Sequence, residues 1–416
     1  MIKRTLAWID LRFPLTSFVK HSVVDYPTPR NLSYWWNFGS LAGIALVLQI
    51  VTGIFLAMHY KADIGMAFDS IQHIMRDVNY GWLLRFIHST GASAFFAVIY
   101  IHMARTLYYG SYRAPRELLW WTGQGLLLLL MATAFMGYLL PWGQMSYWGA
   151  SVITNLFRAT PFIGDYVVVW LRGGFQVGDA TLTRFYALHY LFPFIIVAAV
   201  MVHLVALHTV KSSNPSGINL AAKDNIPFHP YFTIKDLYVL GVYLIVFCIF
   251  VFFLPNAFIE AANNVPANPL QTPAHIKPEW YFLPFYAILR SVPDLAGGVM
   301  AMALSVIIFA AMPFLDRSKI PGGSRYRPVY RTMFYLFIVN IFVLGYVGAK
   351  PLTQNMALLG QFATIFYFTV FLLLPWVSKR EEKYLRDRGL PAEVEALIIE
   401  EEAQKAERKH KSRRHA

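Results

Sequence analysis

Cysteine is nearly absent from this chain, since Cys248 is the one cysteine among 416 residues. A single cysteine cannot form an internal disulfide, and without CxxC or CxxCH motifs the chain has no site for covalent haem and no thiolate set for an iron–sulfur cluster. Charge is scarce as well. Asp, Glu, Lys and Arg make up 14% of the residues and hydrophobic residues 57%, whereas soluble domains carry about 25% charged residues. This composition excludes an ordinary soluble globular protein.

The N-terminus lacks the features of a signal peptide. The stretch MIKRTLAWIDLRFPLTSFVK has no continuous apolar core and no small-residue cleavage site. Its apolar and basic residues instead predict a retained amphipathic helix that lies on the membrane surface, within an N-terminal segment of residues 1–31.

Long apolar runs are what the chain has in abundance. Eight of them are long enough to cross a hydrocarbon core of about 30 Å, at about 32–57, 82–108, 117–140, 184–208, 233–254, 295–315, 328–348 and 355–377. An even number of spans places both chain ends on one side. The ends and the loops on their side carry 24 Lys and Arg, against seven in the opposite loops. The positive-inside rule therefore predicts that both termini are cytoplasmic.

Four histidines recur at a fixed spacing inside two of these runs. His88 and His102 are 14 residues apart, His189 and His203 are also 14 apart, and the two pairs are offset by 101 residues. Fourteen residues come within about 40° of four helical turns and rise about 21 Å, so each pair shares one helix face at two depths. The second and fourth spans run in the same direction. Four histidines on two parallel helices therefore form two facing pairs.

Facing imidazoles in an apolar interior point to bis-histidine haem. Zinc would need a third or fourth protein ligand, whereas haem iron needs two axial ligands and brings its own apolar disc. With both axial positions filled, we expect electron transfer rather than oxygen binding. The alternative is that the histidines donate interhelical hydrogen bonds or form a proton relay, as in a transporter. The pattern predicts two non-covalent b-type haems.

Glycines and arginines support the haem assignment. Glycines separated by 14 residues occur in the first and third spans, where they would let a flat macrocycle approach the backbone; these are Gly39 and Gly53, and Gly123 and Gly137. Arginines near the histidines would meet haem propionates; these are Arg85, Arg105 and Arg184. The alternatives are that glycine is simply common in transmembrane helices and that these arginines extend to the membrane interface.

Several motifs resemble the cytochrome b family of the ubiquinol–cytochrome c oxidoreductase, the respiratory cytochrome bc complex. They are NYGWLLRFIHSTGAS, YYGSYR, MGYLLPWGQMSYWGA, HPYFTIKD and PEWYFLPFYAILR. The resemblance covers roughly residues 20–378. The photosynthetic relatives are split after the fourth helix, and the fused halves here fit the respiratory form. A di-haem membrane anchor of a dehydrogenase would be smaller and would not need the two long loops 141–183 and 255–294.

The resemblance implies two quinone pockets. The outer, quinol-oxidising pocket would be built from Pro278, Glu279, Trp280, Tyr281, Tyr286, Tyr138 and Gly149. The inner, quinone-reducing pocket would use His208, Ser212, Lys235 and Asp236. Glu279 and Asp236 would exchange protons with the quinone. Without the resemblance, Glu279 reads as a solvated loop charge and Asp236 as a charge favoured at a helix N-terminus.

The expected fold is all-α, a polytopic bundle of eight transmembrane helices with two haems between the second and fourth. Residues 32–208 would form the haem-binding half, 209–378 the second half and 379–416 a basic, solvated, partly helical tail. The resemblance implies a protonmotive Q cycle with a Rieske-type iron–sulfur subunit and a c-type cytochrome subunit as partners, in a homodimeric complex. We expect contacts with membrane lipid and none with nucleic acid. The bacterial plasma membrane is the expected location, with the mitochondrial inner membrane as the alternative.

Overall fold

The computed structural model describes residues 2–217, 224–392, 394–396 and 398–399. Within this part of the chain, eight helices are long and apolar enough to cross a membrane. Their cores are α3 (Phe38–Ala57), α5 (Gly81–Tyr109), α6 (Glu117–Leu139), α9 (Asp179–Val210), α10 (Tyr231–Phe252), α12 (Leu295–Ile307, continued through α13, Met312–Leu315), α14 (Pro328–Ala349) and α15 (Gln354–Asp387). The all-α fold with eight candidate spans is confirmed, and most ends agree with the predicted ones within a few residues.

Local backbone chemistry sets the ends of the spans. Helix α5 begins after Tyr80 and ends at Gly110, and both residues adopt the left-handed conformation. Gly110 takes this conformation at no steric cost, and its N–H bonds to the Leu107 carbonyl, which closes the helix. Inside α9, Pro193 is accommodated without ending the helix, as happens in membrane helices whose freed carbonyls find other partners.

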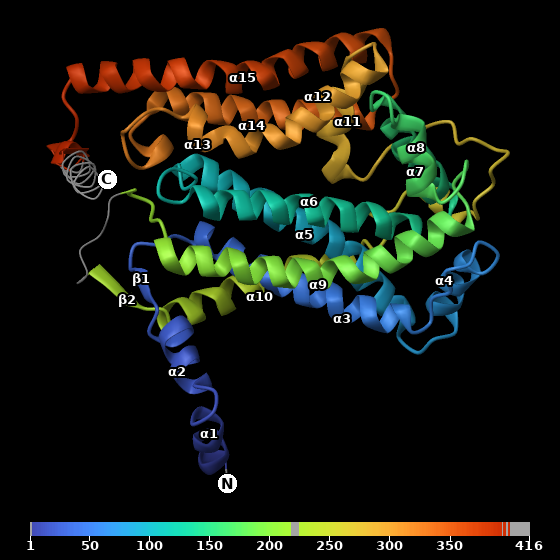
Figure 1. Cartoon of the computed structure of the whole chain (residues 1–416), viewed down its shortest axis with the longest axis horizontal. Coiled ribbons are helices and arrows are strands. Elements are labelled where there is room, and N and C mark those ends of the chain that lie inside the picture. The colour runs from blue at the N-terminus through green and yellow to red at the C-terminus, as the bar shows by residue number, and fades with distance from the viewer. Residues whose placement is uncertain (1, 218–223, 393, 397, 400–416) are drawn as a thin grey trace.

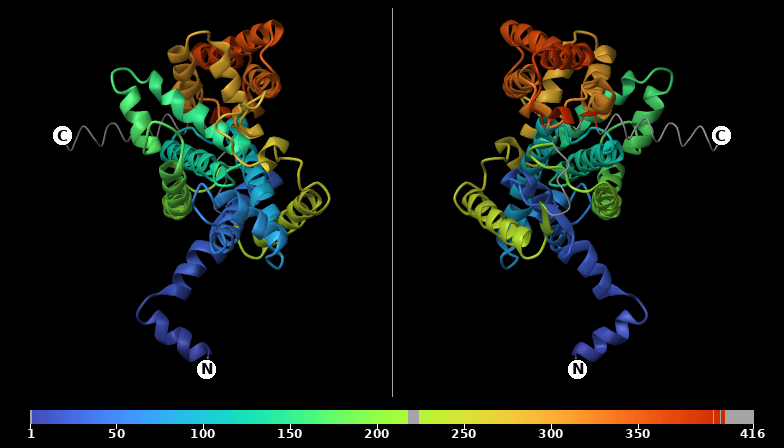
Figure 2. Two further views of the ribbon diagram at one scale, coloured as in Figure 1. Left: turned by 90° about the vertical axis from the view of Figure 1, so that its right-hand side faces the viewer. Right: turned by 90° about the vertical axis from the view of Figure 1, so that its left-hand side faces the viewer.

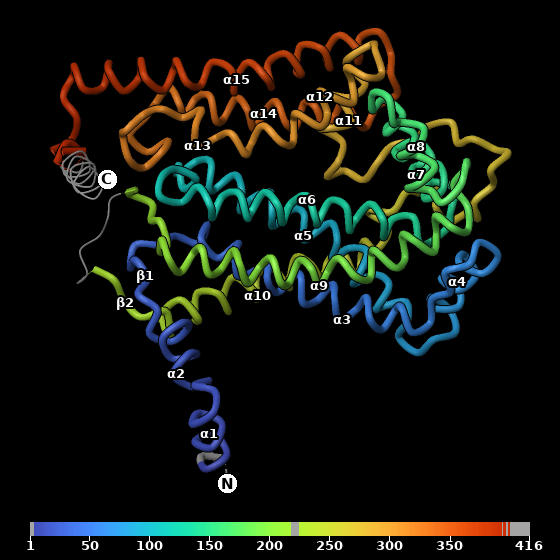
Figure 3. Tube along the Cα trace, viewed as in Figure 1, coloured from blue at the N-terminus to red at the C-terminus, as the bar shows by residue number. Residues whose placement is uncertain are grey.

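The spans form two groups (Figures 1 and 3). In the first group, α3 packs on α5 and α6 packs on α9; in the second, α14 packs on α15 and on α11 (Leu283–Ser291), which also contacts α12. Helix α10 lies against α3 and α5. The predicted division at residue 208 therefore does not follow the packing, because α10 belongs in space to the first group although it was assigned to the second half.

The two long loops 141–183 and 255–294 are folded onto one end of the bundle. The first contains α7 (Gln144–Leu156) and α8 (Gly164–Arg172). The second passes beside it, so that Gln144 N–H donates to the Val265 carbonyl and Ala267 N–H donates to the Trp142 carbonyl. At the same end lies α4 (Ala67–Arg76). These contacts fix the second loop over the ends of the first helix group.

At the opposite end, the N-terminal segment projects away from the bundle (Figure 2). It contains α1 (Ile2–Asp10) and α2 (Leu15–Val19). Large apolar side chains on this segment are exposed, among them Trp8 in α1 and Leu11 and Phe13 between the two helices. Contact of this segment with a membrane surface stays a prediction. The segment is joined to the bundle by a short antiparallel pair in which β1 (Pro27–Pro29) meets β2 (Asn225–Pro227).

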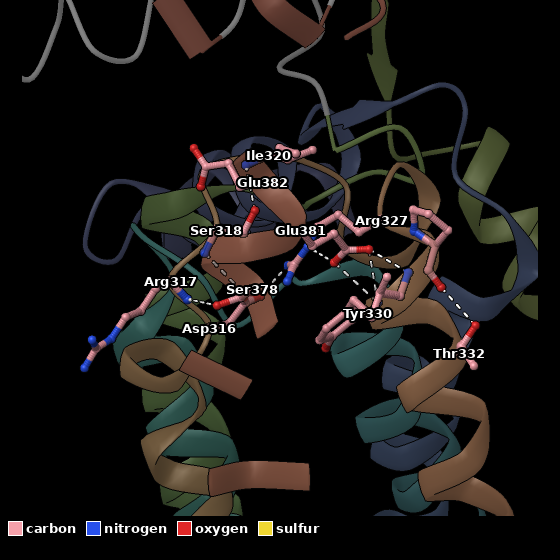
Figure 4. A network of polar contacts seen from close by, with 12 residues as sticks. Asp316, Arg317, Ser318, Ile320, Arg327, Tyr330, Thr332, Ser378, Glu381 and Glu382 are labelled. Atoms are coloured by element: carbon pink, nitrogen blue, oxygen red, sulfur yellow. Dashed lines mark hydrogen bonds and ion pairs between the residues drawn. The ribbon is translucent and has the colours of Figure 1, made fainter. Parts of the chain in front are cut away.

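A buried ionic network ties the end of α15 to the start of α14 (Figure 4). Arg327 has a fully buried side chain and lies 2.8 Å from the Asp316 carboxylate and 3.3 Å from that of Glu381. Burial would raise the pKa of Asp316, but Arg113 and Arg327 hold it below its ordinary value. Glu381 also accepts the backbone N–H of Val329 at 2.6 Å. The network therefore pairs its charges within the protein.

This network refines the prediction for the C-terminal tail. The eighth span was expected to end near 377, with a solvated, partly helical extension after it, and α15 continues as a helix to Asp387. Most of the described residues after 378 are exposed. Glu381, Val394 and Ile398 are the exceptions to the solvated prediction, because they are buried against residues at or near the loop between α13 and α14. Residues 400–416 lie outside the described part of the chain.

Candidate functional site

The four histidines form two pairs across α5 and α9. His88 and His189 have ring centroids 6.2 Å apart and line a cavity together with Glu279, here called the Glu279 cavity. His102 and His203 line a second cavity together with Asp236, here called the Asp236 cavity. When two imidazoles bind the same metal ion from opposite sides, each at about 2 Å, their ring centroids are about 6 Å apart. The spacing of the first pair therefore suits a single iron between the rings.

Each of the four glycines faces one imidazole from the neighbouring helix. The glycines of α3 face the histidines of α5, and the glycines of α6 face those of α9. On α3, a Cβ added at Gly39 would lie 3.3 Å from Cε1 of His102, and one added at Gly53 would lie 3.1 Å from Cε1 of His88. On α6, a Cβ added at Gly123 would lie 3.3 Å from Cε1 of His203, and one added at Gly137 would lie 2.8 Å from Nδ1 of His189. The glycines were predicted to admit a macrocycle edge, but the group that needs the space first is the imidazole itself.

Because glycine has no side chain, it also leaves uncovered the backbone carbonyl that lies four residues before it on the same helix. Helical side chains tilt toward the N-terminus and cover the preceding turn. His189 Nδ1 lies 2.8 Å from the Thr133 carbonyl oxygen, four residues before Gly137. His88 and His203 likewise bond to the carbonyls of Gln49 and Leu119, each four residues before the facing glycine. A glycine at these positions thus seats and orients its histidine.

Two threonines missed by the sequence analysis complete this arrangement. Thr52 Oγ1 lies 2.9 Å from Nδ1 of His88, and Thr122 Oγ1 lies 2.8 Å from Nδ1 of His203. Such partners fix ring orientation and leave Nε2 free to bind a metal. The signal was present in the sequence, because each threonine directly precedes one of the four glycines that are spaced 14 residues apart.

The residues in both cavities fit haem better than a metal ion held by protein alone. In the described part of the chain, no group of three or more His, Cys, Asp or Glu side chains gathers as a metal cluster would require. The Asp236 cavity contains buried polar atoms without a hydrogen-bond partner among the described residues, including Nδ1 of His102, Nε of Arg105 and Nε1 of Trp36. Buried polar atoms of this kind are expected where a ligand with polar edges binds.

The three predicted arginines differ in their placement. Arg85 lines the Glu279 cavity and Arg105 lines the Asp236 cavity, and the guanidinium of Arg105 lies 4.9 Å from the ring centroid of Trp36. Arg184 is exposed, donates to the Trp170 carbonyl on α8 and is not among the cavity residues. The prediction that Arg184 meets a propionate is not supported by this geometry, because its side chain turns toward α8.

Glu279 stands at the wall of its cavity and not in solvent. It is partly buried, and Tyr138 and Tyr281 line the cavity with it. Tyr138 hydrogen-bonds to its carboxylate. Burial and the nearby Glu260 raise the pKa of Glu279 to about 7, so the group gains and loses a proton near neutrality. The reading of Glu279 as a solvated loop charge does not hold.

Of the other residues predicted for this pocket, Tyr281 belongs to the cavity wall and the rest lie outside its lining. Tyr281 is buried and stacks on Phe96 with centroids 3.9 Å apart. Tyr286 donates to the Ile276 carbonyl at 3.2 Å, and a Cβ at Gly149 would touch the Tyr138 ring at 3.9 Å. The predicted residues that are not among those lining the cavity are Pro278, Trp280, Tyr286 and Gly149.

In the second cavity, Asp236 is joined by His208 and Ser212. Its carboxylate accepts from Asn37 Nδ2 at 2.5 Å and from Ser40 Oγ at 2.9 Å. Neither partner was predicted, because both lie almost 200 residues away in the sequence. Asp236 is the sixth residue of α10, which is beyond the first turn where the helix dipole acts, so its hydrogen bonds and the cavity account for it better.

Two neighbours complete the description of this cavity. The ring of His208 stacks on Tyr26 with centroids 4.4 Å apart, and Tyr26 also lines the cavity. Lys235 turns away, because its Nζ donates to the Leu32 carbonyl at 2.5 Å and lies 4.7 Å from the Tyr34 ring centroid. Lys235 is therefore not among the residues that line the cavity, although the residue that it bonds, Leu32, is.

Known proteins similar to this chain share both its sequence and its fold. Residues 23–211 match the family described as cytochrome b/b6/petB, and residues 266–368 match cytochrome b(C-terminal)/b6/petD. Cytochrome b of Rickettsia prowazekii is 58% identical over 379 residues, covering 91% of this chain and 95% of that protein. Cytochrome b of Rhodospirillum rubrum is 56% identical over 381 residues, covering 90% and 94%. A solved chain of a hyperthermophilic respiratory complex III superposes with a TM-score of 0.86 at 38% identity, covering 91% of this chain and all of that one.

Proposed function

The chain belongs to the cytochrome b family of respiratory complex III, and on that premise we propose that it moves electrons across the membrane between two quinone-reactive cavities. As a cytochrome b it is a haem-binding membrane protein of a multi-subunit oxidoreductase. One observation carries the proposal. The two histidine pairs lie at two levels of one helix group, and each level adjoins a cavity with its own carboxylate, Glu279 or Asp236.

The Glu279 cavity is the quinol-oxidising site in this proposal. Oxidation of a quinol releases two protons and two electrons, so the site needs an acceptor that titrates near neutral pH. Glu279 meets this need because its pKa is raised to about 7. Tyr138 orients the carboxylate, and the Tyr281–Phe96 stack gives one wall a rigid, flat surface.

The Asp236 cavity is the quinone-reducing site. Asp236 is held by two donors from the α3 end, Asn37 and Ser40, so its position is fixed before a quinone binds. His208 is held by the Tyr26 ring on the same cavity. An imidazole and a carboxylate together can pass protons to the two oxygens of a reduced quinone.

The histidine pairs would hold two b-type haems, one between His88 and His189 and the other between His102 and His203. Bound haem supplies one-electron carriage between the two levels. Ligand levels 14 residues apart are separated by about 21 Å, which spans most of a hydrocarbon core of about 30 Å. Electrons thus cross the membrane within this chain, as a Q cycle requires.

The remaining cofactors of such a cycle would belong to partner chains. Cys248 alone cannot hold an iron–sulfur cluster or a covalent haem, so we infer separate Rieske-type and c-type cytochrome subunits in a homodimeric complex. The similar bacterial proteins favour a bacterial plasma membrane. From the excess of Lys and Arg on the side of the chain ends, we infer that both termini are cytoplasmic and that the Glu279 cavity is on the outer side.

The test is to count haems and remove them one at a time. Acid acetone should extract two haems per chain. His203→Leu should abolish the absorption band of the haem at the Asp236 cavity while the other haem is still reduced by added quinol. His189→Leu should abolish the other band. His73→Leu serves as the control, because His73 lies on α4 and its side chain is exposed. One haem per chain, covalently retained haem, or both bands in either ligand variant would contradict the proposal.

A further inference from the structure

The two cavities are separated by a single layer of apolar side chains. Four residues line both cavities, and all four belong to one buried cluster. They are Leu46, Phe95, Leu130 and Ile196, with exposed fractions of 6%, 5%, 9% and 3%. Helices α3, α5, α6 and α9 contribute one residue each. We call these four residues the septum.

The septum lies at the midpoint of every 14-residue interval in the site. Leu46 is seven residues from both glycines of α3, and Leu130 is seven residues from both glycines of α6. Phe95 and Ile196 are likewise seven residues from both histidines of their helices. Seven residues come within about 20° of two full turns and rise about 10.5 Å. The four side chains therefore face the same interior as the histidines, halfway between the two levels.

We propose that the septum blocks water and protons between the two cavities while electrons pass between the histidine levels. This inference rests on the proposed function, in which Glu279 receives protons and Asp236 delivers them. A proton that returned directly from one cavity to the other would cancel the charge separation made by the reaction. The septum side chains carry no polar atom, and a water molecule needs two to four polar partners to be stable in a cavity. A charge inside such an apolar layer is strongly disfavoured.

Two leucines on α6 provide a matched test. Leu130 belongs to the septum, whereas Leu127, one turn away and also buried, lines the Asp236 cavity alone. The membrane complex containing Leu130→Ser or Leu127→Ser would be reconstituted into liposomes with a pH-sensitive dye inside, with no quinol added. After a pH step, we expect the Leu130→Ser vesicles to equilibrate about tenfold faster than the Leu127→Ser vesicles, a barrier change of about 1.4 kcal/mol. Equal rates, with both haem bands present in both variants, would overturn the proposal.

A second pair on α9 decides the matter if Leu130→Ser does not assemble. Ile196→Thr places a hydroxyl in the septum, and Val200→Thr places one a turn away, where the residue lines the Asp236 cavity alone. The leak should again rise about tenfold in the first variant relative to the second, and equal leaks would overturn the proposal. Because no quinol is present, the result does not depend on turnover. Failure of quinol to reduce the haems in the unmodified complex would instead refute the proposed function.

Discussion

Replacement of Gly137 by alanine tests how closely a histidine must approach its facing helix. The new Cβ would lie 2.8 Å from Nδ1 and 3.1 Å from Nε2 of His189, well inside van der Waals contact. The ring must therefore shift, and its 2.8 Å bond to the Thr133 carbonyl would be lost. Overpacking costs about 1–3 kcal/mol and a lost hydrogen bond about 0.5–1.5 kcal/mol net. We expect a total penalty of roughly 2–4 kcal/mol at this histidine.

The assay measures, for each of the two histidine pairs, the amount of haem bound and its midpoint potential. Gly137→Ala should reduce the haem band assigned to His88 and His189, or shift its midpoint potential, and leave the other band in place. Gly123→Ala should have a smaller effect on the other haem, because its Cβ would lie 3.3 Å from the His203 ring. Gly125→Ala is the control on the same helix, since a Cβ there meets nothing within 4 Å. If Gly137→Ala matched Gly125→Ala in haem content and potential, the seating role of the glycine would be refuted.

Three further predictions concern charged groups. Burial and Glu260 raise the pKa of Glu279 to about 7, so the carboxyl is protonated below that pH. The rate of quinol oxidation should therefore rise between about pH 6 and 8. Glu279→Gln should remove this rise without changing the haem spectra. Arg327→Met should lower the free energy of unfolding by about 3–5 kcal/mol, because the buried Glu381 carboxylate loses Arg327 and the buried Asp316 carboxylate keeps only one of its two arginines, Arg113. The exposed Arg325→Met should not have this effect, as thermal denaturation in detergent would show. Arg184→Gln should leave both haem potentials unchanged, and a shift of either would restore the propionate assignment.

The spans and the histidine pairing followed from short-range signals in the sequence. Apolar length fixed the sixth span at 295–315, the same limits that the structure gives. The 14-residue spacing put the histidines of each span on one face at two depths, because helical geometry relates positions within one span. That each glycine faces an imidazole was not predicted.

The features that the sequence did not reveal depend on contacts between distant segments. Asn37 and Ser40 bond to Asp236 across almost 200 residues, and no local pattern announces such a pair. The contacts of Glu381 beyond the eighth apolar run were not predicted, because apolar length ignores the network that holds this part of the helix. Arg184 turns toward α8, which the sequence did not reveal because its distance from His189 along the chain does not determine where a long side chain turns.

The N-terminal segment has a consequence for how the two cavities respond to their surroundings. Residues of 22–33, including Tyr26 and Thr28, form one wall of the Asp236 cavity. That wall is attached through a three-residue β pairing and the stack of Tyr26 on His208, and it continues directly into α1 and α2. One side of the Asp236 cavity is therefore continuous in the chain with the N-terminal helices, so a displacement of α1 and α2 would act on the cavity through Tyr26 and its stack on His208.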